Sequence, residues 1–157
     1  MAIEHDAIPN ADLHEPKGVN AATSGQVYVA NGSGSGSWTT KNFYDKVYLT
    51  THYDDLDTTT SHFVVSPITG TITKIYSVID QAIALADTTL TAKIGGVAVT
   101  NGVITIAYSG SAAGDVDSCT PTALNSVSAG STVEFVSGGQ TNTSGAHAHI
   151  TMEITRS

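Results

Sequence analysis

Residues 90–108, LTAKIGGVAVTNGVITIAY, contain three short runs of β-prone residues separated by two glycine-containing pairs. Gly95-Gly96 and Asn101-Gly102 both suit the central positions of a type I′ turn, because these residues adopt positive φ at little cost. We therefore predict two tight hairpins in succession and a three-stranded meander. An isolated meander is only marginally stable in water, so the rest of the chain must supply a second sheet that covers it.

The runs of this meander carry few charges, and Lys93 is the only ionisable group before Tyr108. Successive side chains of a strand point to opposite faces, so every second residue belongs to the same face. The residues that we place on shared faces are Leu90, Ala92 and Ile94 in the first run and Ile104, Ile106 and Tyr108 in the last. Strands so poor in charge need a covering layer.

Strand-like segments also lie on both sides of the meander. We predict them at residues 26–30, 42–51, 62–66, 70–79, 132–137 and 146–155. The last segment shows the cleanest alternation, with Ala148, Ile150, Met152 and Ile154 facing inward and His147, His149, Thr151, Glu153 and Thr155 facing outward. About eight strands follow residue 42, at spacings typical of a sandwich. They predict an all-β fold, namely an antiparallel jelly-roll-like β-sandwich with an extended N-terminal arm.

Two segments between these strands have no clear strand pattern. Residues 80–87, DQAIALAD, are compatible with a short helix or with an irregular strand crossing, because a short apolar run does not distinguish the two. Residues 110–125 have the composition of a loop, with Gly114-Asp115 as a turn and Pro121 as a breaker.

Residues 1–40 differ in composition from the rest of the chain. Apolar residues are sparse in the first part of this segment, so it lacks the pattern of a core-forming element. Any helical or strand period is interrupted by Pro9, Pro16, Gly18 and Gly25. Such a segment is either a disordered tail or an arm that a partner holds in place.

A Gly/Ser run at residues 31–37 is typical of a flexible hinge. It ends at Trp38, the only tryptophan, which needs a pocket either on its own domain or on a partner. We therefore divide the chain into an extended arm with a Gly/Ser hinge at residues 1–40 and a β-sandwich at residues 41–157.

The charge pattern argues against polyanionic partners. The formal net charge is −8, and the six Lys and Arg residues are spread singly along the chain. Binding to nucleic acid requires clustered cations, so we expect no nucleic-acid partner and no attachment to an anionic membrane. No apolar run approaches the length of a membrane span, and the first residues do not resemble a signal peptide. We expect a protein made in the cytosol and not exported by a signal peptide.

Candidate metal ligands are few. His147 and His149 lie two apart on a strand and point the same way, but two imidazoles alone do not make a metal site. A third ligand would have to come from Glu153 or from a symmetry-related chain, and a solvated strand face is the simpler interpretation. The acidic groups Asp54, Asp55 and Asp57, and likewise Asp115 and Asp117, lack the spacing of a calcium loop and are interpreted as loop and turn residues. We expect no obligatory metal and no cofactor.

Catalytic patterns are equally scarce. The sequence has no G-x-S-x-G nucleophile elbow, and no Gly-rich phosphate loop followed by Lys. Cys119, the only cysteine, has no neighbouring His in the sequence and cannot form an intrachain disulfide, so we expect a free thiol. We expect a protein that is not an enzyme.

The N-terminal segment resembles a known family. Residues 8–19, IPNADLHEPKGV, followed by residues 25–30, GQVYVA, and the Gly/Ser run to Trp38, are similar to the N-terminal segment of head decoration (head fibre) proteins of tailed bacteriophages. Residues 68–75, ITGTITKI, together with residues 114–118, GDVDS, resemble the β-domain that often accompanies this segment.

The resemblance implies a non-enzymatic structural protein on the outer surface of an icosahedral phage capsid. Its partners would be the major capsid protein and two further copies of itself in a homotrimer. Residues 1–40 would be the anchor and the β-domain the displayed part. The anchoring residues would be Ile3, Ile8, Pro9, Asp12, Leu13, His14, Glu15, Pro16 and Lys17.

Two other functions remain open at this point. The first is a host-surface adhesin, a glycan-binding domain of a head or tail fibre, in which Tyr, Trp and Asp side chains on loops bind the glycan. The second is a glycan-degrading enzyme, which would reveal itself by turnover of polysaccharide. The number of copies per virus particle distinguishes a decoration protein, present in tens to hundreds of copies, from a tail adhesin, present in a few.

Overall fold

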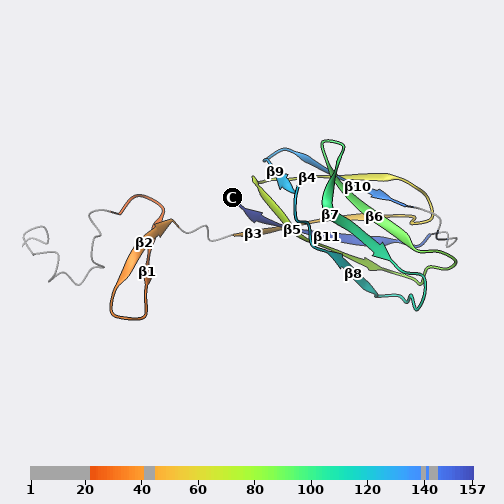
Figure 1. Ribbon diagram of the computed structural model, residues 1–157, viewed down its shortest axis with the longest axis horizontal. Coiled ribbons are helices and arrows are strands. Elements are labelled where there is room, and N and C mark those ends of the chain that lie inside the picture. Colours follow the sequence, from red (N-terminus) through yellow and green to blue (C-terminus); the bar gives the residue numbers. More distant parts are fainter. Residues whose placement is uncertain (1–21, 41–44, 139–140, 142–144) are drawn as a thin grey trace, which may run out of the picture. The chain divides into compact units, whose positions relative to one another are not determined.

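The computed structural model describes residues 22–40, 45–138, 141 and 145–157. The chain forms two compact units, Met1–Phe43 and Tyr44–Ser157 (Figure 1). The division falls three residues beyond the expected boundary at residue 40. The described parts of both units contain only strands, turns and irregular segments.

The described part of the first unit is a β-hairpin. Strand β1 (Gln26–Ala30) pairs antiparallel with β2 (Gly36–Thr40). The loop between them is closed by Asn31, whose side-chain oxygen accepts hydrogen bonds from the backbone N–H groups of Ser33 (2.9 Å) and Ser35 (3.2 Å). The Gly/Ser run therefore forms the hairpin loop and the first residues of β2, with Asn31 satisfying backbone groups of the loop locally. Its role as a hinge stays a prediction.

Trp38 finds its contact within the same hairpin. Its ring lies 5.4 Å from the ring of Tyr28, the residue paired with it across β1 and β2, in an edge-to-face arrangement. Such aromatic pairs across two strands stabilise a hairpin. Of the two locations predicted for Trp38, this contact corresponds to packing on its own unit.

The second unit is a sandwich of two antiparallel sheets. In the first sheet the strand order is β3-β11-β5-β8, with β9 also pairing with β5, and in the second sheet it is β4-β10-β6-β7. The strands are β3 (Lys46–Tyr53), β4 (Ser61–Val65), β5 (Gly70–Ile79), β6 (Thr88–Ile94), β7 (Val97–Ile106), β8 (Val116–Cys119), β9 (Ser126–Val127), β10 (Thr132–Ser137) and β11 (Ala148–Arg156).

This strand order is that of a jelly roll. The chain alternates between the sheets from β3 to β6, forms the β6–β7 hairpin, and returns so that β10 and β11 insert between earlier strands. Each sheet thus combines strands from both halves of the unit, as in a double-sheet jelly roll. The predicted all-β jelly-roll-like sandwich is confirmed.

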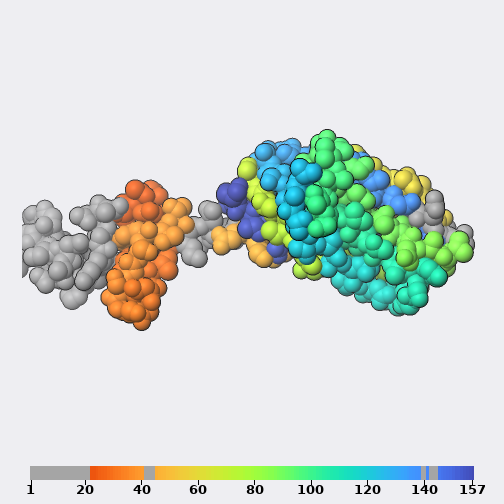
Figure 2. Space-filling view, viewed as in Figure 1, coloured from red at the N-terminus to blue at the C-terminus, as the bar shows by residue number. Residues whose placement is uncertain are grey.

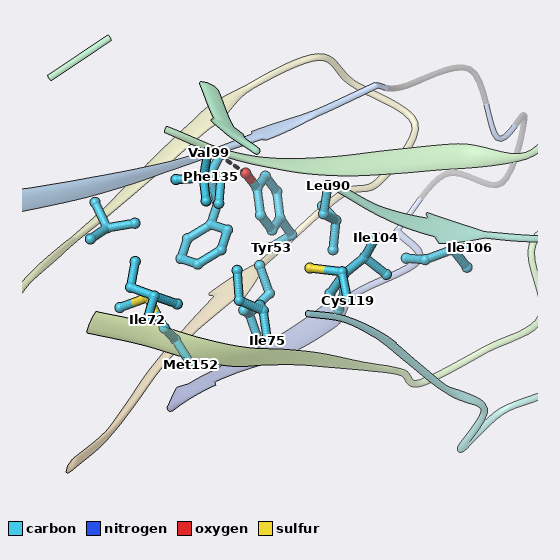
Figure 3. Close-up of a cluster of buried hydrophobic side chains, with 14 of the residues drawn as sticks. Tyr53, Ile72, Ile75, Leu90, Val99, Ile104, Ile106, Cys119, Phe135 and Met152 are labelled. Carbon is cyan, nitrogen blue, oxygen red and sulfur yellow. Dashed lines mark hydrogen bonds between the residues drawn. The ribbon is translucent and has the colours of Figure 1, made fainter. Parts of the chain in front are cut away.

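The core lies between the two sheets (Figure 3). Strand β11 contributes Ala148, Ile150, Met152 and Ile154, each at most 1% exposed, so its predicted inward face is confirmed. The largest buried side chains of this core include Tyr53 from β3, next to β11 in the same sheet, and Phe135 from β10 in the opposite sheet. Burying a large apolar side chain of this kind contributes about 1.5–3 kcal/mol to stability.

The predicted meander is correct in its first turn and wrong in its second. Gly95 and Gly96 form the β6–β7 turn with φ of 57° and 80°. Asn101-Gly102, however, lies inside β7, where the pairing with β6 shifts from Thr91↔Val103 to Lys93↔Ala98. The pair is therefore a bulge and not a hairpin turn.

The bulge persists because its polar groups find partners outside the hairpin. The N–H of Thr100 donates to the carbonyl oxygen of Ala123, and the N–H of Thr122 donates to that of Thr100, both at 3.0 Å. The side-chain amide of Asn101 also donates to the hydroxyl of Thr122 (3.0 Å). These hydrogen bonds replace the inter-strand hydrogen bonds that the bulged residues do not form with β6.

Three further expectations are corrected. Residues 116–119 form strand β8 instead of a loop, because they pair with β5. Glu153, expected on a solvated face, is only 8% exposed, and Tyr108 is 47% exposed beyond the end of β7. Residues 80–87, for which a helix and an irregular crossing were both open, form an irregular crossing from β5 to β6, and Ile83 among them is buried in the core.

The sandwich has two chemically different ends. At one end, which we call the linker end, β3 begins after residues 41–44 and the N–H of Arg156 donates to the carbonyl oxygen of Asp45 (2.8 Å). At the other, the loop end, the described residues 54–60, 80–87, 107–115, 138, 141 and 145–147 meet. Figure 2 shows the dark blue C-terminal residues at the linker end and yellow-green and teal loops at the loop end of this unit.

Candidate functional site

The residues predicted to anchor the protein lie outside the described residues. They are Ile3, Ile8, Pro9, Asp12, Leu13, His14, Glu15, Pro16 and Lys17. Their assignment therefore stays a prediction, and the candidate site described below belongs to the sandwich.

The outer face of the first sheet carries polar and aromatic side chains in regular cross-strand rows. The residues of these rows are Tyr48, Glu153 and Lys74; Thr50, Thr151, Tyr76 and Ser118; and His52, His149, Val78 and Val116. Tyr76 is 39% exposed and Val116 is 64% exposed. Most of the polar side chains in these rows carry hydroxyl groups.

Glu153 is enclosed by its neighbours on this face. One carboxylate oxygen lies 2.9 Å from Nζ of Lys46 and accepts a hydrogen bond from the hydroxyl of Thr73 (2.6 Å), and the other accepts one from the hydroxyl of Tyr48 (3.2 Å). The hydrogen bond from Lys46 is the largest cause that holds the pKa of Glu153 below its ordinary value, followed by that from Thr73. The negative charge of Glu153 is thus balanced by Lys46 on the neighbouring strand.

A shallow depression of about 290 Å³ lies on the same face. It is lined by Tyr76, Ser77, Val78, Val116, His149 and Thr151, which come from the three neighbouring strands β5, β8 and β11. Nζ of Lys74 lies 5.7 Å from the centre of the Tyr76 ring and donates to the hydroxyl of Thr120 (3.0 Å). The depression therefore combines an apolar lining with a hydroxyl, an imidazole and a nearby cation.

The two histidines singled out by the sequence are held by different partners. His147 precedes β11, and its Nδ1 lies 2.6 Å from a carboxylate oxygen of Asp80, whose other oxygen accepts the His147 N–H (2.8 Å). That backbone hydrogen bond is the largest cause that lowers the pKa of Asp80. His149 lies on β11 with its ring 6.1 Å from that of His52 on β3. Among the described residues, no group of three or more His, Cys, Asp or Glu side chains is arranged to hold a metal ion.

The loop end is acidic. The four loops that meet there contain no Lys or Arg, and their acidic residues are Asp54, Asp55, Asp57, Asp80, Asp87 and Asp115. Asp55 accepts the N–H of Asp57 (3.0 Å), and Asp115 accepts the N–H of Ala112 (2.6 Å). These two side chains are turn formers, as predicted. Asp117 instead lies in β8, where burial raises its pKa, with a smaller contribution from Asp115.

Cys119 is the free thiol of the chain and is buried in the core (Figure 3). Burial raises the pKa of this thiol to about 11, although the charge of Lys74 opposes the shift. A thiol with so high a pKa is almost entirely protonated at neutral pH and is a poor nucleophile. Cys119 is therefore a core residue in this fold.

Part of the depression could be found from the sequence. His149 and Thr151 belong to the outward face predicted for the last strand, but Val116 belongs to β8, which was predicted as a loop. Tyr76 and Val78 lie on the predicted strand 70–79, but the sequence pattern assigned no face to them, since the polar Ser77 is the inward residue between them.

A scan against protein-family models and a search of curated proteins find no match to this chain. The described part of the chain contains no helix long and apolar enough to cross a membrane.

Proposed function

We propose that this protein is a non-enzymatic virion protein that decorates and stabilises the outside of an icosahedral phage capsid. In this proposal the N-terminal segment binds the major capsid protein and the jelly roll is displayed on the outer surface. The observation that carries the proposal is the division of the chain. The N-terminal segment that resembles head decoration proteins belongs to the unit Met1–Phe43, and the other unit, Tyr44–Ser157, is a sandwich with its own core.

The distribution of charge supports this orientation of the sandwich. The four loops of the loop end contain six acidic residues and no Lys or Arg, whereas at the linker end Lys46 and Arg156 lie near a single aspartate, Asp45. A chain of net charge −8 meets least repulsion from neighbouring copies when its most acidic end points away from a crowded surface.

The physical role would be mechanical. Packaged DNA pushes the shell subunits apart, and a protein that binds across several of them adds its interface free energy to each junction. A stable interface of ordinary size buries about 1,600 Å² in total, and an extended segment reaches this area with few residues. Pro9 and Pro16 would lower the entropy that the segment loses when it becomes ordered on the shell.

Deletion of residues 1–25 tests this proposal, because it leaves the hairpin and the sandwich intact. The shortened protein should keep its far-ultraviolet circular dichroism and its unfolding transition, but it should no longer sediment with shells of the cognate capsid protein. In the complementary experiment, residues 1–40 fused to an unrelated soluble protein should sediment with the shells. A full-length variant with the loop-end substitution Asp87→Asn serves as the control and should bind normally. Equal binding by the shortened and full-length proteins would show that the anchor lies elsewhere.

The proposal includes a homotrimer. A 157-residue chain without a disulfide, with hydroxyl-rich outer strand faces, has few other sources of added stability. Light scattering on the isolated protein should give three times the mass of the chain. A monomer both in solution and on decorated shells would contradict this part of the proposal.

A further inference from the structure

We propose that the depression on the outer face of the first sheet binds a pyranose ring of an acidic glycan, one that carries a carboxylate. The site consists of Tyr76, Val78 and Val116 as the apolar surface, His149 and Thr151 as the polar rim, and Lys74 as the cation. The inference concerns a binding activity of the isolated protein and does not depend on attachment to a capsid.

The apolar part of the depression suits one face of a sugar ring. A pyranose presents a face of C–H bonds, and such a face packs well against an aromatic ring. Tyr76 and Val116 are both substantially exposed on the same sheet face, and Val78 lies between them in the register of β5 and β8. A volume of about 290 Å³ lies at the lower limit for ligand pockets and therefore fits one ring better than a larger ligand.

The rim of the depression suits the hydroxyls of the same ring. Thr151 and His149 are neighbours on β11, and each can both donate and accept a hydrogen bond when the imidazole is neutral. Thr50 and His52 continue these two rows onto β3, so the polar surface extends beyond the depression. Sugar residues on either side of the bound ring would meet this hydroxyl-rich surface.

Charge complementarity selects an acidic sugar. Of the charged groups described on this face, Glu153 is paired with Lys46, whereas Lys74 has a hydroxyl partner, Thr120, and no carboxylate within ion-pair distance. Its Nζ lies beside the Tyr76 ring, so a carboxylate on a ring stacked against Tyr76 would come within reach of this cation. A hydrogen bond between Lys and a carboxylate is charge-assisted and stronger than one between neutral groups.

The test uses two carboxylated probes, a glucuronate-containing tetrasaccharide and a sialylated trisaccharide, each with its carboxyl-reduced counterpart. Binding to the full-length protein is followed by titration calorimetry and by NMR shifts of backbone amides. At least one acidic probe should bind about tenfold more tightly than its reduced form, and the shifts should map to β5, β8 and β11. The probe that binds identifies the type of acidic sugar.

Three variants locate the site. Tyr76→Ala should weaken binding of the acidic probe about tenfold or more, and Lys74→Gln should bring the acidic and reduced forms to within about twofold of each other. Val116→Glu places a carboxylate at the mouth of the depression and should also abolish binding, which keeps the test valid if Tyr76→Ala is unstable. Phe63→Ala is the matched control, because Phe63 is an aromatic residue 61% exposed on the outer face of the other sheet. This variant should bind the acidic probe as tightly as the natural protein does.

Four results would overturn the inference. The first two are no binding of either acidic probe and equal binding of the acidic and reduced forms. The other two are NMR shifts that map away from the first sheet, and a loss of affinity in Phe63→Ala as large as that in Tyr76→Ala. None of these results bears on sedimentation with shells, so failure of this inference is distinguishable from failure of the proposed function.

Discussion

The hydroxyl of Tyr53 donates a hydrogen bond to the backbone carbonyl oxygen of Phe135 and so connects the two sheets through the core (Figure 3). Tyr53 lies on β3 in the first sheet, and Phe135 lies on β10 in the second. Both side chains are almost completely buried, and burial raises the pKa of Tyr53, so the hydroxyl stays protonated as a donor throughout the ordinary pH range.

Replacing this hydroxyl should destabilise the sandwich. In Tyr53→Phe the ring still fills the core, but the carbonyl of Phe135 loses a buried partner, and the free energy of unfolding should fall by about 1–2 kcal/mol. Urea unfolding followed by fluorescence measures this change. Tyr108→Phe, which alters an exposed ring, should change stability by less than about 0.5 kcal/mol. An equal effect of both variants would show that the bond between the sheets contributes nothing.

The network around Glu153 should make stability depend on pH. The pKa of Glu153 in the folded protein lies below its ordinary value of 4.5, so the unfolded chain binds more protons than the folded protein between these two values. The contribution of Glu153 is therefore complete above pH 4.5 and is lost as the pH falls through the folded pKa. The stability difference between the natural protein and Glu153→Gln should accordingly shrink in urea titrations as the pH falls from about 5 through the lowered folded pKa of Glu153.

The partner variant Lys46→Gln provides the check on this explanation. Removing the largest cause of the shift should bring the pKa of Glu153 closer to its ordinary value and so reduce the loss of stability in acid. If Lys46→Gln and the natural protein lose stability identically as the pH falls, the ion pair is not the origin of the effect.

The bulge in β7 should require glycine at position 102. A Cβ atom added to Gly102 would lie 2.7 Å from Cβ of Val99, whose side chain is buried in the core. Gly102→Ala should therefore destabilise the protein by about 1–3 kcal/mol through overpacking. In the control Gly95→Asn, the added Cβ atom would have no neighbouring atom within 4 Å, and asparagine tolerates the left-handed φ of this position. The melting temperature of this variant should therefore change little. Similar melting temperatures for Gly102→Ala and the natural protein would refute the steric argument.

Stability should not depend on a bound metal at the histidines. His149 is exposed, and His147 is held by Asp80. Adding a chelator should leave the melting temperature unchanged, and the double variant with His147→Thr and His149→Thr should stay within about 1 kcal/mol of the natural protein. A large drop in melting temperature on chelation, restored by added zinc, would prove this expectation wrong.

Much of the strand pattern could be predicted, and its failures have a common cause. The bounds of β1, β5 and β10 match the predicted segments 26–30, 70–79 and 132–137. Strand β8 was missed because its residues have little β-propensity of their own and become a strand by pairing with β5. Asn101-Gly102 has the signature of a hairpin turn, yet its backbone is satisfied by residues 122–123 from a distant part of the chain.

Only part of the candidate site could be predicted from the sequence. The outward positions of His149 and Thr151 follow from alternation, but the depression exists because β5 pairs with both β11 and β8. Glu153 follows the same alternation outward, and its enclosure depends on Lys46 and Thr73, which belong to strands on either side of β11.

The amino-acid sequence alone determined which residues of β11 face the core and where the β6–β7 turn lies, because side-chain alternation and positive φ are properties of neighbouring residues. Only the tertiary structure decided that β11 lies between β3 and β5, that residues 99–102 bulge, and that Tyr76 and Val116 line one depression. These arrangements depend on hydrogen bonds between strands far apart in the chain. Such bonds form only when the whole sandwich packs, so no local pattern encodes them.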